Sequence, residues 1–156
     1  MNRSVASLLA ALAFVATCAL AAERIYPPVS AAKADVAAAL KEAAATHRRV
    51  IVDFGGDWCT DCQVLDIRFR EPANAQLLQR HYVVVRVNVG DKGIKDNFDV
   101  AERYGIPLKK GVPALAVLEG DGRVVYSQKN GEFESMRSMD GASVTRFLRQ
   151  WAPPAS

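Results

Sequence analysis

The strongest constraint on this chain is a short strand that delivers two cysteines to the start of a helix. Residues 50–54 are mostly β-branched and aromatic, which predicts a buried strand. Two glycines end that strand. Cys59 and Cys62 follow just before residues 63–69, whose apolar side chains recur at helical spacing. We therefore expect both cysteines on the first turn of a helix.

A helix N-terminus changes the chemistry of a cysteine. The unpaired backbone N–H groups of the first turn and the positive end of the helix dipole favour a thiolate over a thiol. The second thiol follows three residues later, about one helical turn away, within reach to close a disulfide. The pattern indicates a pair that alternates between dithiol and disulfide.

Two other roles for a Cys-x-x-Cys pair fit the sequence less well. A zinc site usually needs four ligands, and the two histidines, His47 and His81, lack a ligand's spacing to the cysteines. A purely structural disulfide would close a loop too small to remove much chain entropy. We therefore predict redox chemistry, with no bound metal and no organic cofactor.

The N-terminus has the pattern of a secretory signal peptide. One arginine precedes an apolar run over residues 5–20, and Ala19 and Ala21 supply the small residues that a signal peptidase reads. The run is shorter than the roughly 20 residues of a spanning helix, so an anchor that stays attached is less favoured. We predict a signal peptide over residues 1–21 and one domain over residues 22–156.

Cys18 offers a second way in which the N-terminus can be processed. Residues 15–18 loosely resemble the lipobox of bacterial lipoproteins, in which the cysteine becomes the lipidated first residue. Lipid anchoring through Cys18 is therefore a minor alternative to cleavage after Ala21. After that cleavage the exported protein keeps only Cys59 and Cys62, and has no spare thiol with which to scramble its own disulfide.

The charge pattern argues against a nucleic-acid partner. The formal net charge is +3, and the 20 lysines and arginines are scattered among 17 acidic residues. Nucleic-acid binding would require a basic stripe with interleaved aromatic residues, which the sequence lacks. These charges indicate a solvated surface.

The remaining apolar patterns predict alternating helices and strands. Ser30 is a candidate N-cap for a helix to about residue 46, with Val36 and Leu40 on one face. Residues 82–89 are apolar on both faces near their start, as expected of a central parallel strand. The helix that carries the cysteines is predicted to end near Glu71-Pro72. Further helices are predicted over residues 74–80 (with Leu77 and Leu78 buried), 98–104 and 142–151. Further strands are predicted over residues 114–118 and 123–126, joined by a turn at 120–122.

This order of elements predicts an α/β fold. Two strands joined by a helix are expected to be parallel, with a right-handed crossover, and the terminal hairpin to be antiparallel to them. We expect a central mixed sheet of four to five strands with helices on both faces.

The chain resembles the thioredoxin superfamily at several positions in register. Residues 52–54 (Val-Asp-Phe) and 58–62 (Trp-Cys-Thr-Asp-Cys) are similar to the family's strand and redox motif. Residues 104–106 (Tyr-Gly-Ile) and 111–113 (Gly-Val-Pro) resemble its tyrosine-glycine turn and its cis-proline loop. The resemblance covers nearly all of residues 22–156 and implies the thioredoxin fold. The Asp-Trp-Cys context is most similar to exported members, among them the C-terminal domain of the membrane thiol:disulfide interchange protein DsbD.

The resemblance implies catalytic roles for three residues. Cys59 is expected to be the exposed, attacking thiolate, and Cys62 to resolve the mixed disulfide that Cys59 forms with a substrate. Asp53, a carboxylate in an apolar strand, would accept the proton of Cys62. Arg86 lies where many members have a lysine and is expected to hold Asp53 charged.

The same resemblance implies a substrate-binding surface. Pro113 is expected in the cis form, which would leave the backbone of Val112 free to pair with an extended substrate. Trp58 is expected to shield the site and to offer an apolar contact. Residues 107–110 lengthen the connection to this loop, and Thr-Asp replaces Gly-Pro between the cysteines, so ordinary thioredoxin substrates are not implied.

The resulting prediction is a periplasmic thiol:disulfide oxidoreductase that reduces protein disulfides. Asp57 and Asp61 place negative charge near Cys59, which disfavours its thiolate and makes the disulfide harder to reduce. An exported reductant needs electrons from across the membrane, which implies a membrane donor of the DsbD type in addition to protein substrates. A disulfide oxidase or isomerase, and a redox-inactive thioredoxin-fold binding module, remain alternatives.

Overall fold

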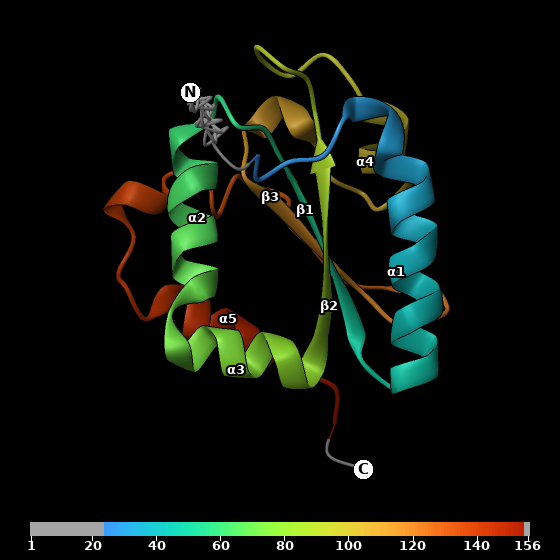
Figure 1. The fold of residues 1–156 in the computed structure, drawn as a ribbon. Helices are drawn as coiled ribbons and strands as arrows, with labels where there is room; N and C mark the ends of the chain where they lie inside the picture. Colours follow the sequence, from blue (N-terminus) through green and yellow to red (C-terminus); the bar gives the residue numbers. More distant parts are fainter. Residues whose placement is uncertain (1–23, 155–156) are drawn as a thin grey trace, which may run out of the picture.

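The computed structural model describes residues 24–154 (Figure 1). The predicted signal peptide and Cys18 therefore lie outside the described residues. Within that range no helix is both long and apolar enough to cross a membrane. The helices are α1 (Ala32–Thr46), α2 (Thr60–Arg70), α3 (Pro72–His81), α4 (Phe98–Arg103) and α5 (Ser143–Gln150), and the strands are β1 (Arg49–Gly55), β2 (Tyr82–Asn88), β3 (Ala114–Leu118) and β4 (Val124–Ser127).

The four strands form one mixed sheet in the order β2-β1-β3-β4. β1 and β2 are parallel, and β3 is antiparallel to both β1 and β4, as the sequence predicts. The prediction of β2 as a central strand is wrong, because β2 forms an edge of the sheet. β2 is apolar on both faces because helices cover both faces of the sheet. It does not have a neighbouring strand on each side.

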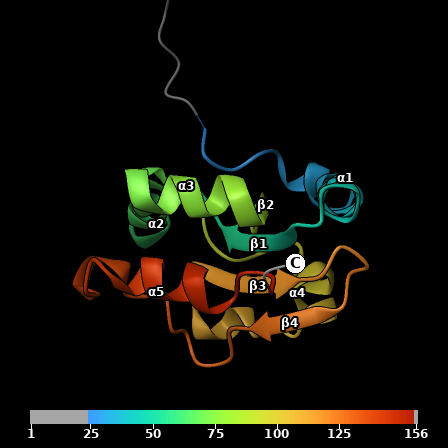
Figure 2. The ribbon, with the colours of Figure 1, turned by 90° about the horizontal axis from the view of Figure 1, so that it is seen from below.

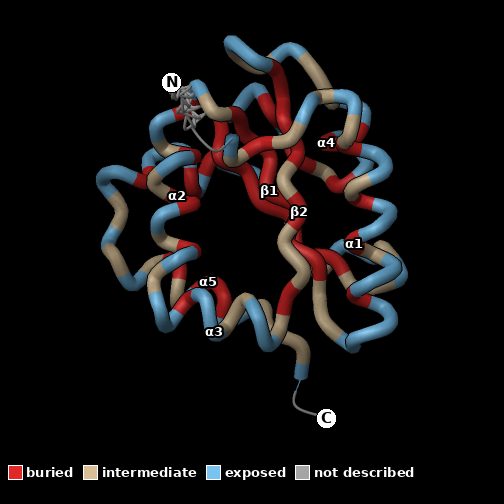
Figure 3. Tube along the Cα trace, in the orientation of Figure 1, coloured by how far each residue is buried: buried red, intermediate tan, exposed pale blue. Residues whose placement is uncertain are grey.

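Helices cover both faces of the sheet. Seen along the strands, α1 and α4 lie on one side, and α2, α3 and α5 lie on the other (Figure 2). β1 supplies both cores, because Val50, Val52 and Phe54 pack with the α1 side and Ile51 packs with the α5 side. The buried residues follow the strands and the inner helix faces, and the outer helix faces are exposed (Figure 3).

The start of α1 differs from the prediction. A short 3-10 turn, η1 (Val29–Ala31), includes Ser30, and the N-cap of α1 is Ala31, which makes no side-chain cap hydrogen bond. Ser30 is therefore not the N-cap, because its backbone is already part of the preceding turn. At the other end His47 closes the helix as predicted, in the left-handed conformation (φ 54°), with its N–H bonded to Ala43 O.

The break between α2 and α3 lies at Glu71 and Pro72, as predicted. The expected burial on α3 is only partly correct, since Leu77 and Leu78 are half-buried against the core. The fully buried residue of α3 is Asn74, which bonds to the Arg68 carbonyl oxygen at 2.8 Å and accepts from Thr145 Oγ1 at 2.7 Å. This polar link fastens α2 and α3 to α5.

Candidate redox site

Both cysteines lie at the N-terminal end of α2, joined by a disulfide with a Cα–Cα distance of 5.2 Å. Cys59 is the N-cap residue and not part of the first turn, one position earlier than expected. The backbone N–H of Cys62 donates to Cys59 Sγ at 3.1 Å. The sulfur thus takes the place that a capping oxygen usually holds, and an anionic sulfur there would be stabilised by the helix end.

The two sulfurs differ in access. Cys62 is fully buried and Cys59 keeps 7% of its surface exposed, so Cys59 is the more accessible of the two but is less open than the sequence led us to expect. The Val112 carbonyl oxygen lies 3.5 Å from Cys59 Sγ and accounts for part of this cover. A substrate sulfur therefore has to approach through a narrow opening at Cys59.

The loop with Pro113 lies beside the end of β1. Ala114 pairs with Phe54 across the sheet, which brings the Val112–Pro113 peptide next to the cysteines, and this peptide is cis as expected. The buried Gln128 fixes the loop, since its Nε2 donates to Pro113 O and its Oε1 accepts from Leu115 N, both at 3.1 Å. In the lengthened connection, a 3-10 turn over Leu108–Lys110 buries Leu108 in the core.

Trp58 lies at the edge of the site with 39% of its surface exposed. Its Nε1 donates to Gly90 O at 2.6 Å, and its ring covers Gly56, where any Cβ would lie 2.5 Å from that nitrogen. The indole is therefore held by a polar contact while much of its ring faces solvent, an arrangement that presents apolar surface next to Cys59.

Asp53 is buried in β1, in register with Arg86 of β2. Both of its carboxylate oxygens lie 3.0 Å from Tyr26 Oη, which donates to them, and Arg86 Nε lies 3.9 Å away. Burial raises the pKa of Asp53 to about 6; Arg86 and the Tyr26 hydrogen bond pull it down, and Asp66 raises it slightly. A carboxyl group with this pKa can take up and release protons near neutral pH.

Arg86 is shared between two acids. Its Nη2 donates to Asp66 Oδ1 of α2 at 2.5 Å, and Arg70 pairs with the other Asp66 oxygen at 2.9 Å. Among residues 24–154, Arg86 Nε is buried without a hydrogen-bond partner. The expected proximity of Arg86 to Asp53 is therefore confirmed, but Asp66 holds the closer ion pair.

The acidic residues flanking Cys59 are both hydrogen-bonded. Asp57 Oδ1 accepts from the backbone N–H groups of Ile25 and Tyr26, at 2.9 and 3.2 Å. Asp61 accepts from the backbone and guanidinium of Arg137. Desolvation raises the pKa of Asp61, but the Arg137 hydrogen bonds and charge outweigh it, so the pKa lies below its ordinary value. Asp61 therefore repels a Cys59 thiolate less than the sequence suggests.

Sequence reasoning missed Tyr26, Asp66 and Arg137. Tyr26 lies in a segment without periodicity, and Arg137 lies in a polar region without helical or strand pattern. Of these three residues, only Asp66 could have been found from the sequence, because it is an acidic residue on the apolar face of α2, four residues after Cys62.

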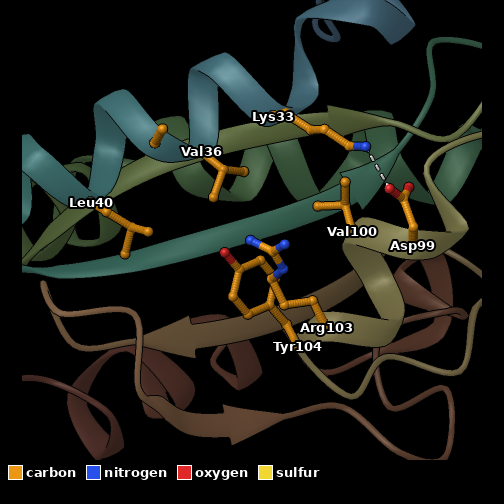
Figure 4. A pocket seen from close by; sticks show the side chains of 8 residues that line it. Lys33, Val36, Leu40, Asp99, Val100, Arg103 and Tyr104 are labelled. Carbon is orange, nitrogen blue, oxygen red and sulfur yellow. Dashed lines mark ion pairs between the residues drawn. The ribbon is translucent and has the colours of Figure 1, made fainter.

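One cavity lies away from the cysteines. About 230 Å³ in volume, it sits between α1 and α4, with Val36, Leu40 and Val100 on its walls and the Lys33–Asp99 ion pair at its rim (Figure 4). A second cavity, of about 320 Å³, adjoins the redox motif and is lined by Asp61, Arg137 and their neighbours.

Comparisons with known proteins agree with this geometry. A family model described as thioredoxin-like matches residues 31–120. A thioredoxin from Buchnera aphidicola subsp. Schizaphis graminum is 30% identical over 91 residues, which cover 58% of this chain and 73% of that protein.

Solved structures show the same fold. A disulphide isomerase from Xylella fastidiosa Temecula1 is similar with a TM-score of 0.77 and 33% identity, covering 83% of this chain and 98% of that one. The reduced C-terminal domain of Neisseria meningitidis DsbD has a TM-score of 0.53 at 20% identity, covering 76% and 95%, and supports the fold alone. The chain belongs to the thioredoxin-like family and is a thiol–disulfide oxidoreductase, with Cys59–Cys62 as its redox-active disulfide.

Proposed function

We propose that this protein reduces disulfides in other proteins, with Cys59 as the attacking thiolate and Cys62 as the resolving thiol. The observation that carries the proposal is the unequal access of the two sulfurs at the end of α2. Only Cys59 can meet a substrate, whereas Cys62 can reach only Cys59.

The reaction then proceeds in two exchanges. The Cys59 thiolate attacks one sulfur of the substrate disulfide, and the other substrate sulfur leaves as a thiolate. Cys62 loses its proton and attacks Cys59, which releases the second substrate thiolate and closes the Cys59–Cys62 disulfide. Asp53 is the proton acceptor in this step, because it is buried in the strand that leads to the two cysteines and its pKa of about 6 suits a base.

The substrate surface consists of Trp58 and the Val112–Pro113 peptide. The exposed part of the indole offers apolar contact area, and the Val112 backbone is the group next to Cys59 that can pair with an extended chain. Pro113 positions that backbone through the link between its carbonyl oxygen and Gln128.

The charges around Cys59 support reduction of the substrate as the direction of electron flow. A strong oxidant favours its thiolate with nearby positive charge. Here the Asp57 carboxyl group lies two residues before Cys59, and the cation of Arg137 is engaged by Asp61. Even with Asp61 neutralised, this balance favours a reductant.

The N-terminal sequence supports an exported place of action. Residues 1–21 have the pattern of a signal peptide, so the protein would act in the periplasm, with lipid anchoring through Cys18 as a minor alternative. A reductant in that compartment needs electrons from across the membrane, and a membrane donor of the DsbD type would supply them.

A disulfide isomerase is the second candidate, and the similarity to the Xylella disulphide isomerase favours it. Two assays separate the candidates: reduction of insulin and recovery of activity from scrambled ribonuclease A. A reductase is expected to turn over insulin with little refolding of ribonuclease, and a refolding rate above the insulin rate would favour the isomerase. Absence of both activities in the wild-type protein would leave a redox-inactive binding module.

A further inference from the structure

Tyr26 is a buried phenol in the middle of the redox machinery. It has no exposed surface, and its Oη lies 3.0 Å from both oxygens of Asp53. One hydroxyl has one hydrogen to donate and two lone pairs to accept with. While it donates to Asp53, Tyr26 Oη can therefore still accept a hydrogen from another group.

Cys62 is the thiol next to this hydroxyl. A Cβ added to Gly55 would lie 2.6 Å from Tyr26 Cζ, even closer to Tyr26 Oη, and 2.8 Å from Cys62 Sγ. The phenol and the sulfur therefore both approach Gly55, and they can do so because Gly55 has no side chain. The Tyr26 hydroxyl thus lies in a buried position between Asp53 and Cys62.

The segment that carries Tyr26 is fixed at both sides of that residue. The backbone N–H groups of Ile25 and Tyr26 donate to Asp57 Oδ1, two residues before Cys59. Asn88 Nδ2, at the end of β2, donates to Pro27 O at 3.0 Å. The phenol is thereby tied to the same loop as the cysteines.

We propose that Tyr26 relays the proton between Cys62 and Asp53 during resolution of the mixed disulfide. The relay deepens the proposed function and rests on the roles given there to Cys59 and Cys62. As Cys62 attacks Cys59, its proton passes to Tyr26 Oη while the phenol proton passes to an Asp53 oxygen. The Cys62–Cys59 bond forms, the bond between Cys59 and the substrate breaks, and the substrate sulfur leaves with the electron pair. Tyr26 ends as a neutral phenol and Asp53 as a carboxylic acid, which later loses its proton to solvent.

The charges around the pair favour a relay without a phenolate. Burial, then the charge of Asp53 and its hydrogen bond, raise the pKa of Tyr26 well above its usual value, so the two protons must move together. Arg86 faces Asp53 from β2 and Asp66 faces Arg86 from α2, with Arg70 on the outer Asp66 oxygen. The base in this set is Asp53, since Asp66 already holds two ion pairs.

The test separates the two exchanges by single-turnover kinetics. Reduced protein is mixed with one equivalent of Ellman's reagent across pH 5–9, where attack by Cys59 gives a concentration-dependent phase and resolution by Cys62 a concentration-independent one. Tyr26→Phe is expected to leave the first phase unchanged and to slow the second by roughly 10- to 100-fold at neutral pH. The difference should shrink at high pH, where solvent can deprotonate Cys62.

Two further variants distinguish a relay from a structural role. Tyr82→Phe is the matched control, because it removes another buried hydroxyl that is hydrogen-bonded, here to Leu148 O at 2.7 Å. In a relay, Tyr26→Phe combined with Asp53→Asn resolves no more slowly than Asp53→Asn alone. Additive losses, equal slowing of both phases, or a second phase like that of Tyr82→Phe would overturn the relay.

A fluorinated tyrosine at position 26 covers the case in which Tyr26→Phe fails to fold. Its phenol is more acidic at nearly the same size, so the rate of the second phase should change at neutral pH while the rate of the first phase stays fixed. An unchanged rate of the second phase overturns the relay. A wild-type protein that shows no second phase would instead overturn the proposed role of Cys62, and the relay with it.

Discussion

Asp53 shows how a single buried acid can serve chemistry at the expense of stability. Its pKa is about 6 in the folded protein against an ordinary value of 3.8, so the native state holds a proton that the unfolded chain has released. Stability contributed by the protonated form is therefore present below about pH 4 and lost as the pH rises through 6. Above that range the buried charge destabilises the fold.

Asp53→Asn is expected to remove this pH dependence. At pH 7.5 the variant should be more stable by about 1–3 kcal/mol, because each unit of pKa shift corresponds to roughly 1.4 kcal/mol. At pH 4 the gain should nearly vanish. Urea unfolding at pH 7.5 and at pH 4 measures the free energy of unfolding, with Asp91→Asn as the control because Asp91 is exposed. A stability change of the same size at both pH values would contradict the burial of an ionising group.

The two cysteines are expected to fail in different ways. Cys59→Ser should abolish disulfide reduction, because Cys62 has no exposed surface from which to attack. Cys62→Ser should trap mixed disulfides through Cys59 that mass spectrometry can detect. Full multiple-turnover activity in Cys62→Ser would show that Cys62 does not resolve the intermediate.

At the scale of elements, the start of α2 is coupled to the segment between β4 and α5. Arg137, in this segment, holds Asp61 of the redox motif through backbone and side-chain hydrogen bonds. Phe133 and Met136 of the same segment are buried among the residues of α5. This polar-looking segment is therefore a packed cover over the second face of the sheet.

Arg137→Ala should leave Asp61 uncompensated and raise the pKa of the Cys59 thiol by about half a unit, since the Arg137 side chain is largely exposed and solvent screens its charge. The ultraviolet absorbance of the thiolate, followed against pH in the reduced protein, measures the change. Arg146→Ala is the control, because Arg146 pairs with the exposed Asp140 away from the cysteines. A fall in the pKa of Cys59 would contradict the proposed compensation.

The order of helices and strands could be predicted because it depends on local apolar periodicity and on glycine and proline. The failures lie where tertiary context decides. Whether β2 lies at the centre or the edge of the sheet depends on which strands pair. Ser30 is not the N-cap of α1 because its backbone belongs to the turn that precedes the helix. Tyr26 could not be found, because no local pattern says that a lead-in segment folds back onto Asp53.

At the scale of the whole molecule, the fold gathers residues that are far apart in the chain. The parallel pairing of β1 with β2 and its antiparallel pairing with β3 bring Asp53, Arg86 and the Pro113 loop together at one end of the sheet. The segment before α1 adds Tyr26, and the segment after β4 adds Arg137. All of these groups bear on one equilibrium, that between the Cys59–Cys62 disulfide and its dithiol.

The reduction potential of the Cys59–Cys62 pair decides whether the protein is a reductant. It is obtained by equilibrating the protein against a glutathione series and counting the reduced fraction by alkylation. Because negative and neutralised side chains surround Cys59, we predict a potential near the value of about −270 mV found for thioredoxin. A potential above about −160 mV would contradict the account and make the protein an oxidase or isomerase.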